Sequence, residues 1–172
     1  MKELIRKEIL NKRKNIEFKD QKDLMIINHL KSIINDFNNI MIYYPISNEP
    51  NILNIMVNNK NYYLPYCINK DIEVRKIVSL DDLEKDEANV LSSKVKTNDM
   101  IEVVIVPAVA MNRQFFRLGY GKGYYDRFLK HKNVLKIAVV YNDFLIDEQY
   151  QDEWDVCFDY IVTEKEIIKK EI

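Results

Sequence analysis

Apolar and polar residues alternate along the chain at two different spacings. Short runs rich in β-branched side chains predict buried strands at residues 40–44, 101–106 and 134–141. Stretches with apolar residues three or four positions apart predict helices at 2–15 and 20–38. Shorter helices are expected at 50–58 and 123–130. Because strands and helices alternate, we expect an α/β domain with a mainly parallel sheet.

The remaining stretches give weaker patterns. Short strands are predicted at residues 62–66, 72–78 and 160–162. Asp20 is the predicted cap of the second helix, and Thr163 with Glu166 forms a capping-box pattern that predicts a closing helix. Residues 79–99 are polar and turn-like, so we expect a surface excursion there. No internal repeat or linker divides the chain, which predicts a single domain over residues 1–172.

Composition narrows the class of protein. Hydrophobic residues make up 47% of the 172-residue chain and charged residues 31%, which is typical of a globular protein. The net charge of −1 argues against a general nucleic-acid surface, and no apolar run approaches membrane-spanning length. The charged N-terminus predicts no signal peptide, and Cys67 and Cys157 lack metal-ligand spacing. We therefore expect a cytoplasmic protein with buried thiols and neither nucleic-acid nor membrane partners.

All three glycines of the chain lie in one stretch, Arg117–Arg127, at positions 119, 121 and 123. Glycine tolerates positive φ and lets a ligand approach bare backbone. With Lys122 and nearby arginines, this loop suits a polyanion held on backbone N–H groups. Asp126 could then hold a divalent cation against that anion, or cap the following helix. The alternative for the whole loop is a tight strand-to-helix turn with solvated charges, but a turn rarely needs three glycines.

The spacing of this loop excludes the two common nucleotide motifs. A Walker loop needs Ser or Thr after its lysine, whereas Lys122 is followed by Gly123. In the dinucleotide pattern the third glycine would come one residue later.

Two further sets of residues are open to two interpretations. Lys2, Arg6 and Arg13 follow at near-helical spacing and share one face, which is either a solvated basic face or part of a site. Glu49 stands directly before Pro50. It is either a helix-start residue or a carboxylate at the C-terminal end of a strand, where open α/β sheets bind ligands.

The segments Pro107–Arg113 and Arg117–Arg127 together closely resemble the 5-formyltetrahydrofolate cyclo-ligases, also called 5,10-methenyltetrahydrofolate synthetases. The string R-L-G-x-G-x-G-Y-Y-D is long and specific. The resemblance extends over almost the whole chain, and it includes Lys2 and Arg6, Glu49 after the first strand, and the region from Trp154 to Glu164.

The resemblance implies ATP-dependent cyclisation of 5-formyltetrahydrofolate to 5,10-methenyltetrahydrofolate with Mg²⁺, in a monomer or weak homodimer. It also implies a three-layer αβα fold like that of phosphosugar isomerases and CoA-transferases. ATP is expected to contact Lys2, Arg6, Arg117, Leu118, Gly119, Tyr120, Gly121, Lys122, Gly123, Tyr124 and Tyr125. Within this set Arg117 and Lys122 are the predicted catalytic cations. Tyr44 and Glu49 are expected to face the folate, and Asp126 and Asp155 to serve the metal.

The chain departs from the family pattern at two places. Asn112 stands where an aspartate is usual, which predicts weaker ordering of the loop that follows. Residues 91–95 replace an expected aromatic and Glu-Pro segment. These departures keep two alternatives open: a non-catalytic nucleotide-binding or interaction module derived from such an enzyme, and a kinase for another pterin or amide.

Overall fold

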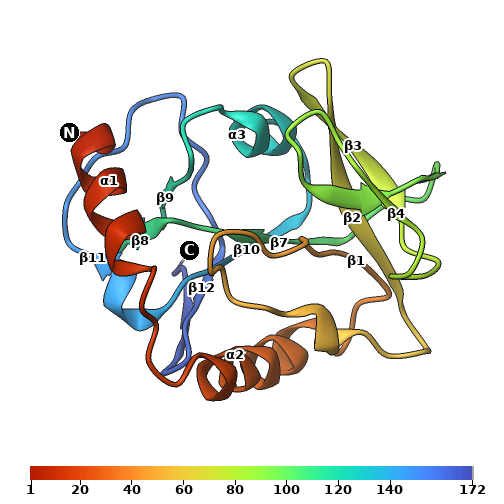
Figure 1. The fold of residues 1–172 in the computed structure, drawn as a ribbon, viewed down its shortest axis with the longest axis horizontal. Coiled ribbons are helices and arrows are strands. Elements are labelled where there is room, and N and C mark those ends of the chain that lie inside the picture. Colours follow the sequence, from red (N-terminus) through yellow and green to blue (C-terminus); the bar gives the residue numbers. More distant parts are fainter. Residues whose placement is uncertain (172) are drawn as a thin grey trace.

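The computed structural model describes residues 1–171, which form a mixed α/β domain around one eight-stranded sheet (Figure 1). The helices are α1 (Lys2–Lys12), α2 (Lys19–Ile34) and α3 (Tyr124–Leu129). The large sheet has the order β13-β12-β10-β7-β1-β2-β3-β6. Its strands are β1 (Asn39–Met41), β2 (Asn61–Ile68), β3 (Asp71–Lys76), β6 (Val95–Lys96), β7 (Val103–Pro107), β10 (Leu135–Val139), β12 (Tyr160–Val162) and β13 (Ile167–Lys169).

The middle of the large sheet is parallel and its edges are antiparallel. Strands β12, β10, β7, β1 and β2 run parallel to one another, whereas β13 closes one edge and β3 and β6 the other in antiparallel pairing. Every residue of β7 is buried. Parallel strands are covered on both faces, which explains the continuous apolar runs in the sequence. The predicted α/β domain with a mainly parallel sheet is confirmed.

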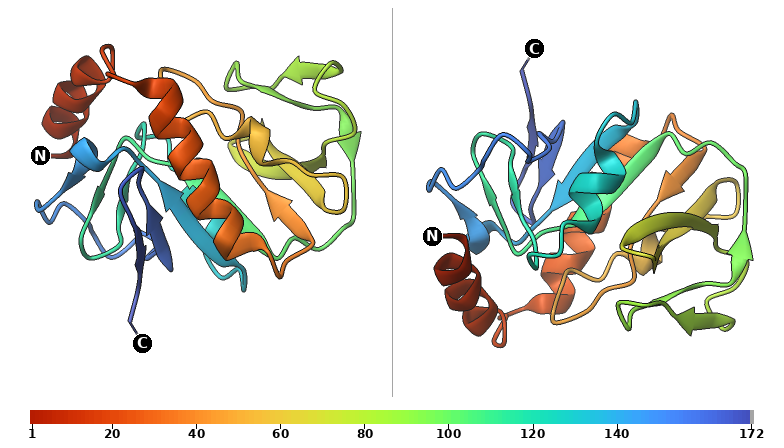
Figure 2. Two further views of the ribbon diagram at one scale, coloured as in Figure 1. Left: turned by 90° about the horizontal axis from the view of Figure 1, so that it is seen from below. Right: turned by 90° about the horizontal axis from the view of Figure 1, so that it is seen from above.

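Helices α2 and α3 lie on opposite faces of the sheet, and α1 lies beside it (Figures 1 and 2). Ile26, Leu30 and Ile34 of α2 are buried against the core. The predicted likeness to phosphosugar isomerases and CoA-transferases stays a prediction. Within residues 1–171, no helix is both long and apolar enough to cross a membrane.

The second helix differs from the prediction at both ends. It begins at Lys19 after Phe18, whose backbone is left-handed, so Asp20 does not cap it. It ends at Ile34, before residue 38, because the ammonium of Lys60 donates to the carbonyls of Ile34 (3.2 Å) and Asn35 (2.9 Å). A cation on free carbonyl groups satisfies a helix C-terminus as further helical turns would.

The predicted helix at 50–58 is wrong. Only Leu53–Ile55 forms a short 3₁₀ turn, which begins where the Asn51 side chain accepts a hydrogen bond from the Leu53 N–H (3.1 Å). Downstream, the Val57 N–H donates to the Tyr62 hydroxyl (3.2 Å), which replaces a helical bond. Ile52 and Ile55 are nevertheless buried, so the apolar spacing indicated burial but not helix.

The predicted closing helix is also wrong. The Thr163 hydroxyl accepts hydrogen bonds from the N–H groups of Lys165 and Glu166, each at 3.1 Å. The Thr163 N–H donates to the Glu166 carbonyl (3.0 Å), which closes a turn. The chain then pairs as β13 along the free edge of β12. A residue that caps a helix and a residue in a turn make the same local hydrogen bonds. Here the pairing of β13 with β12 selects the turn over the helix.

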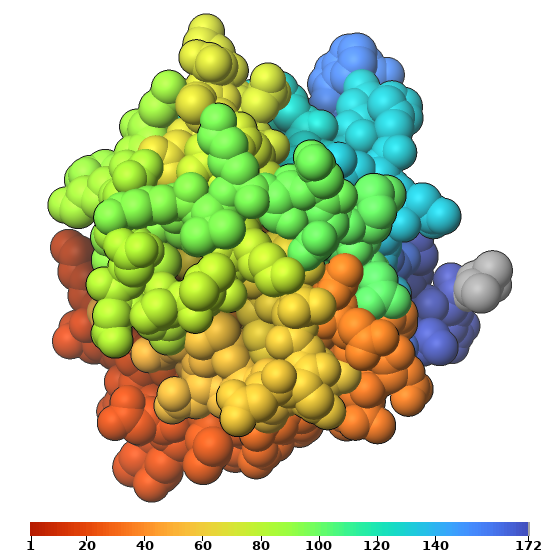
Figure 3. All heavy atoms as spheres, turned by 90° about the vertical axis from the view of Figure 1, so that its right-hand side faces the viewer, coloured from red at the N-terminus to blue at the C-terminus, as the bar shows by residue number. Residues whose placement is uncertain are grey.

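Residues 79–99 are more than the predicted surface excursion. They contain a hairpin of β4 (Leu83–Lys85) and β5 (Leu91–Ser93) and lead into β6. Figure 3 shows this part of the chain spread across one face of the molecule. Ser92 and Ser93 of β5 are buried, so this hairpin forms part of the wall of the domain.

A second small sheet, which the sequence analysis missed, leads into the glycine loop. It has the order β11-β8-β9, with β8 (Ala110–Asn112), β9 (Arg117–Leu118) and β11 (Leu145–Ile146). Strands this short leave too few residues for an alternating pattern.

Candidate functional site

A cavity of about 550 Å³ lies where β1 and β7 end. The chain leaves β1 into residues 43–49, and β7 ends at Pro107, and both line the cavity. Parallel strands bring their carboxyl ends to one edge, where α/β sheets bind ligands. The cavity brings together every site residue predicted from the sequence: Lys2, Arg6, Tyr44, Glu49, Arg117, Leu118, Gly119, Tyr120, Gly121, Lys122, Gly123, Tyr124, Tyr125, Asp126 and Asp155.

The glycine loop connects β9 to α3. Gly121 has φ +96° and Gly123 has φ +71°, values that residues with a Cβ rarely adopt. The Arg6 guanidinium donates through Nε to the Gly119 carbonyl at 2.6 Å, so α1 is attached directly to this loop. Positive φ at alternate positions leaves backbone N–H groups available to an anion.

Arg117 lies inside the cavity wall. Its Nε donates to the Pro107 carbonyl at 2.6 Å, and its guanidinium stacks 4.9 Å from the Tyr125 ring centre. Burial lowers the pKa of Arg117, although an arginine stays charged at neutral pH. The side chain therefore holds a half-buried positive charge, which favours an anionic ligand.

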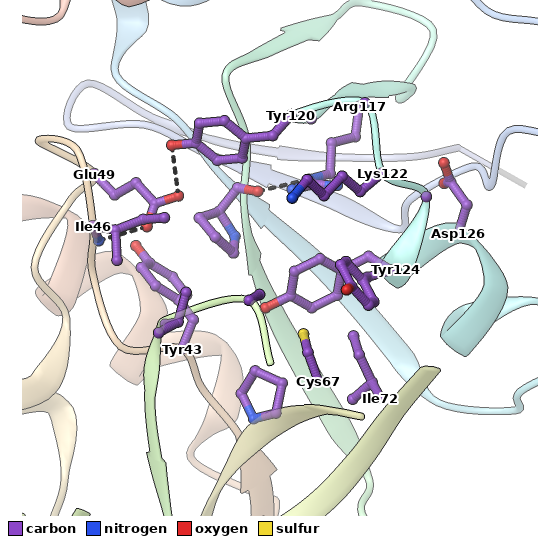
Figure 4. Close-up of a pocket in the computed structure, with 18 of the residues that line it drawn as sticks. Tyr43, Ile46, Glu49, Cys67, Ile72, Arg117, Tyr120, Lys122, Tyr124 and Asp126 are labelled. Carbon is purple, nitrogen blue, oxygen red and sulfur yellow. Dashed lines mark hydrogen bonds between the residues drawn. The ribbon is translucent and has the colours of Figure 1, made fainter. Parts of the chain in front are cut away.

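Glu49 is 3% exposed and lies at the opposite end of the cavity from Asp126 (Figure 4). Its carboxylate accepts hydrogen bonds from the Ile46 N–H (2.8 Å) and the Tyr120 hydroxyl (3.2 Å). Burial raises the pKa of Glu49, and the Ile46 N–H and Arg13 oppose that rise. No helix follows Glu49, so its interpretation as a helix-start residue is wrong.

Asp126 and Asp155 face the same cavity from distant parts of the sequence. Burial raises the pKa of Asp126, and the negative charge of Asp155 raises it further. The Lys2 ammonium pairs with Asp155 at 2.9 Å and with Asp152 at 3.2 Å. Burial lowers the pKa of Lys2, but these two carboxylates outweigh that effect and raise it.

The donor set around Asp126 fits a cation that is shared with a phosphate. Residues 1–171 contain no group of three or more His, Cys, Asp or Glu side chains that could hold a metal by themselves. Mg²⁺ needs fewer protein ligands, because one or two carboxylates are usually completed by waters and substrate phosphates. Asp126 and Asp155 provide two such carboxylates beside the glycine loop.

The wall of the cavity opposite the loop was not predicted from the sequence. This wall consists of Pro65, Cys67, Ile72, Asp86, Ala88, Val90 and Leu91. Asp86 shapes it by accepting hydrogen bonds from the N–H groups of Cys67 (2.8 Å), Ala88 (2.9 Å) and Val90 (3.1 Å). Burial raises the pKa of the Cys67 thiol to about 12, so it remains protonated at neutral pH.

Asn112 is hydrogen-bonded to the loop that follows it, while the expected weaker ordering of that loop stays a prediction. Its Oδ1 accepts hydrogen bonds from the N–H groups of Gln114 (3.2 Å) and Phe116 (3.1 Å), as an aspartate oxygen would. Its Nδ2 donates to the Glu148 carbonyl (3.2 Å) and the Gln151 side chain (2.7 Å). A side-chain amide both donates and accepts hydrogen bonds, so Asn112 can satisfy the oxygens and the N–H groups around it.

Comparisons with known proteins agree on one family. The sequence profile of the 5-formyltetrahydrofolate cyclo-ligase family matches residues 1–164. The chain is 32% identical to the 5-formyltetrahydrofolate cyclo-ligase of Mycoplasma genitalium, over 72% of this chain and 71% of that protein. It is similar to the NMR structure of Aquifex aeolicus 5,10-methenyltetrahydrofolate synthetase, with TM-score 0.85, 28% identity, and 98% and 92% of the two chains covered. The Mycoplasma pneumoniae synthetase structure gives TM-score 0.73 and 28% identity, with 95% and 98% covered.

Proposed function

Because the chain belongs to the 5-formyltetrahydrofolate cyclo-ligase family, we propose that it cyclises 5-formyltetrahydrofolate to 5,10-methenyltetrahydrofolate at the expense of ATP. One observation carries this proposal. A single cavity has a buried carboxylate, Glu49, at one end and a cationic glycine loop at the other (Figure 4). Such a cavity suits two ligands that meet in the middle, one with N–H donors and one with phosphates.

The nucleotide is proposed to lie along the glycine loop. Lys2, Arg6 and Lys122 supply positive charge there, and the backbone at Gly121 and Gly123 can approach the phosphates closely. The folate is proposed to lie against Tyr44 and Glu49, where a carboxylate accepts hydrogen bonds from the N–H groups of a pterin.

The proposed reaction has two steps. The formyl oxygen is a poor leaving group, so it first takes the γ-phosphoryl group of ATP, and ADP is released. The N10 nitrogen then attacks the activated formyl carbon and gives up its proton, and inorganic phosphate departs with the former formyl oxygen. Neither step requires a nucleophilic side chain. Phosphoryl transfer depends mainly on positioning and charge neutralisation, and Arg117 and Lys122, which both line the cavity, are proposed to provide them.

Asp126 and Asp155 are proposed to hold Mg²⁺, which would neutralise phosphate charge when the nucleotide is bound. The Lys2 ammonium pairs with Asp155, so Lys2 and Mg²⁺ are expected to compete for this carboxylate.

Activity tests the proposal directly. Purified protein with Mg-ATP and 5-formyltetrahydrofolate should develop the near-ultraviolet absorbance of methenyltetrahydrofolate, with release of ADP and phosphate. Binding of ADP without any absorbance change, whatever the divalent metal supplied, would instead favour a non-catalytic binding module.

A further inference from the structure

We propose that Arg13 is a positioning residue that fixes Glu49 and joins the loop of residues 46–49 to Tyr120 of the glycine loop. Its side chain is 2% exposed and does not line the cavity itself. It contacts the glycine loop on one side and the loop of residues 46–49 on the other. The role in ligand binding rests on the proposed function, whereas the contacts to Glu49 do not.

The guanidinium of Arg13 makes bonds to both loops at once. Its Nε and Nη2 donate to the Ser47 carbonyl at 3.0 and 2.6 Å. Its Nη2 also donates to the Tyr120 hydroxyl at 2.5 Å, and that hydroxyl donates to the Glu49 carboxylate at 3.2 Å (Figure 4). Since the Tyr120 oxygen accepts from Arg13, its proton is directed to Glu49. A continuous chain of hydrogen bonds thus runs from Arg13 to the carboxylate.

The loop that carries Glu49 needs such support. Ser47 and Asn48 have φ values of +48° and +60°, and two consecutive left-handed residues with a Cβ are unfavourable without compensating contacts. The Asn48 side chain donates to the backbone carbonyl of Arg13 at 2.9 Å. Lys19 donates to the Glu49 carbonyl at 3.1 Å. The loop is therefore attached to the end of α1 and the start of α2.

Arg13 is a cation in a buried position. Burying a cation is costly, and an apolar side chain would commonly stabilise such a position better. Its contacts with Ser47 and with Tyr120 of the glycine loop give a reason for keeping this arginine.

Arg13 also acts on the charge state of Glu49. The charged and titratable groups around this carboxylate are Arg13, Lys19, Tyr43, Arg117, Tyr120 and Tyr125. Burial raises the pKa of Glu49, while Arg13, Arg117 and the Tyr120 hydroxyl lower it. Loss of Arg13 or of the Tyr120 hydroxyl should therefore make Glu49 harder to ionise.

The test follows the Glu49 carboxyl by carbon NMR in the free protein, with the signal assigned from its loss in Glu49→Gln. We expect the pKa of Glu49 to rise in Arg13→Gln and in Tyr120→Phe. Lys12→Gln is the matched control, because Lys12 is the neighbouring exposed cation of α1 and pairs with Glu8 on the surface. It should leave Glu49 unchanged. Tyr120→Phe keeps the ring, so it carries the test even if Arg13→Gln fails to fold.

Calorimetric titration with 5-formyltetrahydrofolate supplies the second measurement. Tyr120→Phe should weaken binding roughly tenfold, as loss of a hydrogen bond to a charged group does. It should have no further effect in a Glu49→Gln background, because the hydroxyl acts through Glu49. An unchanged pKa of Glu49 in both variants overturns the proposal. A raised pKa with unchanged folate affinity supports the positioning role and contradicts the assignment of Glu49 to the folate.

Discussion

At the scale of single residues, Glu49 carries a cost in stability that its place in the cavity explains. A carboxylate that is 3% exposed loses hydration, and the N–H of Ile46 and the hydroxyl of Tyr120 compensate only in part. The pKa of Glu49 is accordingly raised, with burial as the main cause. A side chain kept in such a position at the expense of stability is typical of functional sites.

The cost of burying the Glu49 carboxylate should appear as a pH-dependent difference in unfolding free energy between wild type and Glu49→Gln. Between the unfolded value of 4.5 and the raised folded pKa, the folded protein binds more protons than the unfolded chain. The free energy of unfolding of the wild type therefore falls as pH rises through this window. Above the window, the difference in this free energy between wild type and variant stays constant. Urea unfolding at several pH values should show Glu49→Gln gaining stability relative to wild type as pH increases above about 4.5. Glu8→Gln, an exposed carboxyl on α1, is the control and should show no such trend.

Asp126→Asn should separate a metal role from a structural role in α3. Asp126 lies in the first turn of α3, whose N-cap is Gly123 without a side-chain cap hydrogen bond, so the predicted cap role is wrong. Loss of its charge near the helix N-terminus costs only about 0.3–1 kcal/mol, so the variant should remain folded. If Asp126 holds the cation, turnover should fall steeply and rise again in part at high Mg²⁺ concentration, because Asp155 and the phosphates remain as ligands. Asp147→Asn, an exposed carboxyl paired with Arg113, should behave as wild type. Near-normal turnover at low Mg²⁺ in Asp126→Asn would assign this residue to the helix alone.

At the scale of elements, the accuracy of the sequence predictions followed the source of each element's stability. The runs around Ile105 and Ile137 are buried on both faces of a parallel sheet, and that environment is visible in the sequence. The helix predicted after Pro50 and the one after Thr163 failed because Tyr62 and the edge of β12 supplied competing partners from elsewhere in the chain. Such partners leave no local pattern.

The candidate site was predictable where its chemistry is local. The glycine loop needs positive φ at Gly121, and glycine is the residue that provides it. Asp86 and Arg13 act only after folding, when one organises the cavity wall and the other reaches across to Ser47. A single carboxylate in a charged stretch carries no sequence signal that distinguishes it from a surface residue. The spacing of Arg13 with Lys2 and Arg6 did not decide between a solvated face and part of a site.

Helix α1 is held partly by polar contacts that also build the site. Arg6 bonds to the Gly119 carbonyl and Lys2 pairs with Asp155, while Ile9 is buried and Ile5 and Leu10 pack partly buried against the core. An element beside the sheet that depends on such polar contacts opens more easily than the centre of the core.

We therefore expect amide hydrogens of residues 2–12 to exchange faster than those of β7, and to slow when Mg-ATP binds. Hydrogen exchange followed by mass spectrometry checks this. Arg6→Gln should abolish the nucleotide-dependent protection of α1, whereas Lys12→Gln, on the same helix, should retain it. Protection that is independent of nucleotide would show that α1 is docked without the ligand.

At the scale of the whole molecule, the sheet order brings the two halves of the site together. Strands β1 and β7 are neighbours and parallel, so the residues that follow them, 43–49 and the segment leading to the glycine loop, leave from the same edge. Tyr120 from the glycine loop reaches Glu49, so the two halves are in direct contact as well as adjacent. A protein that must bring two substrates into reaction needs this arrangement.

The two halves should still bind different ligands. Glu49→Gln removes a charge-assisted acceptor and should weaken 5-formyltetrahydrofolate binding by roughly 1.5–3 kcal/mol, with little effect on ADP. Gly121→Val should do the reverse. A Cβ at Gly121 would lie 3.5 Å from the Arg6 guanidinium, which is ordinary contact, so the damage should come from the φ of +96° and from a branched side chain on the phosphate-facing backbone. Calorimetric titration of each variant with both ligands measures the two effects separately. Loss of nucleotide binding with intact folate binding in Glu49→Gln would show that this division of the cavity is wrong.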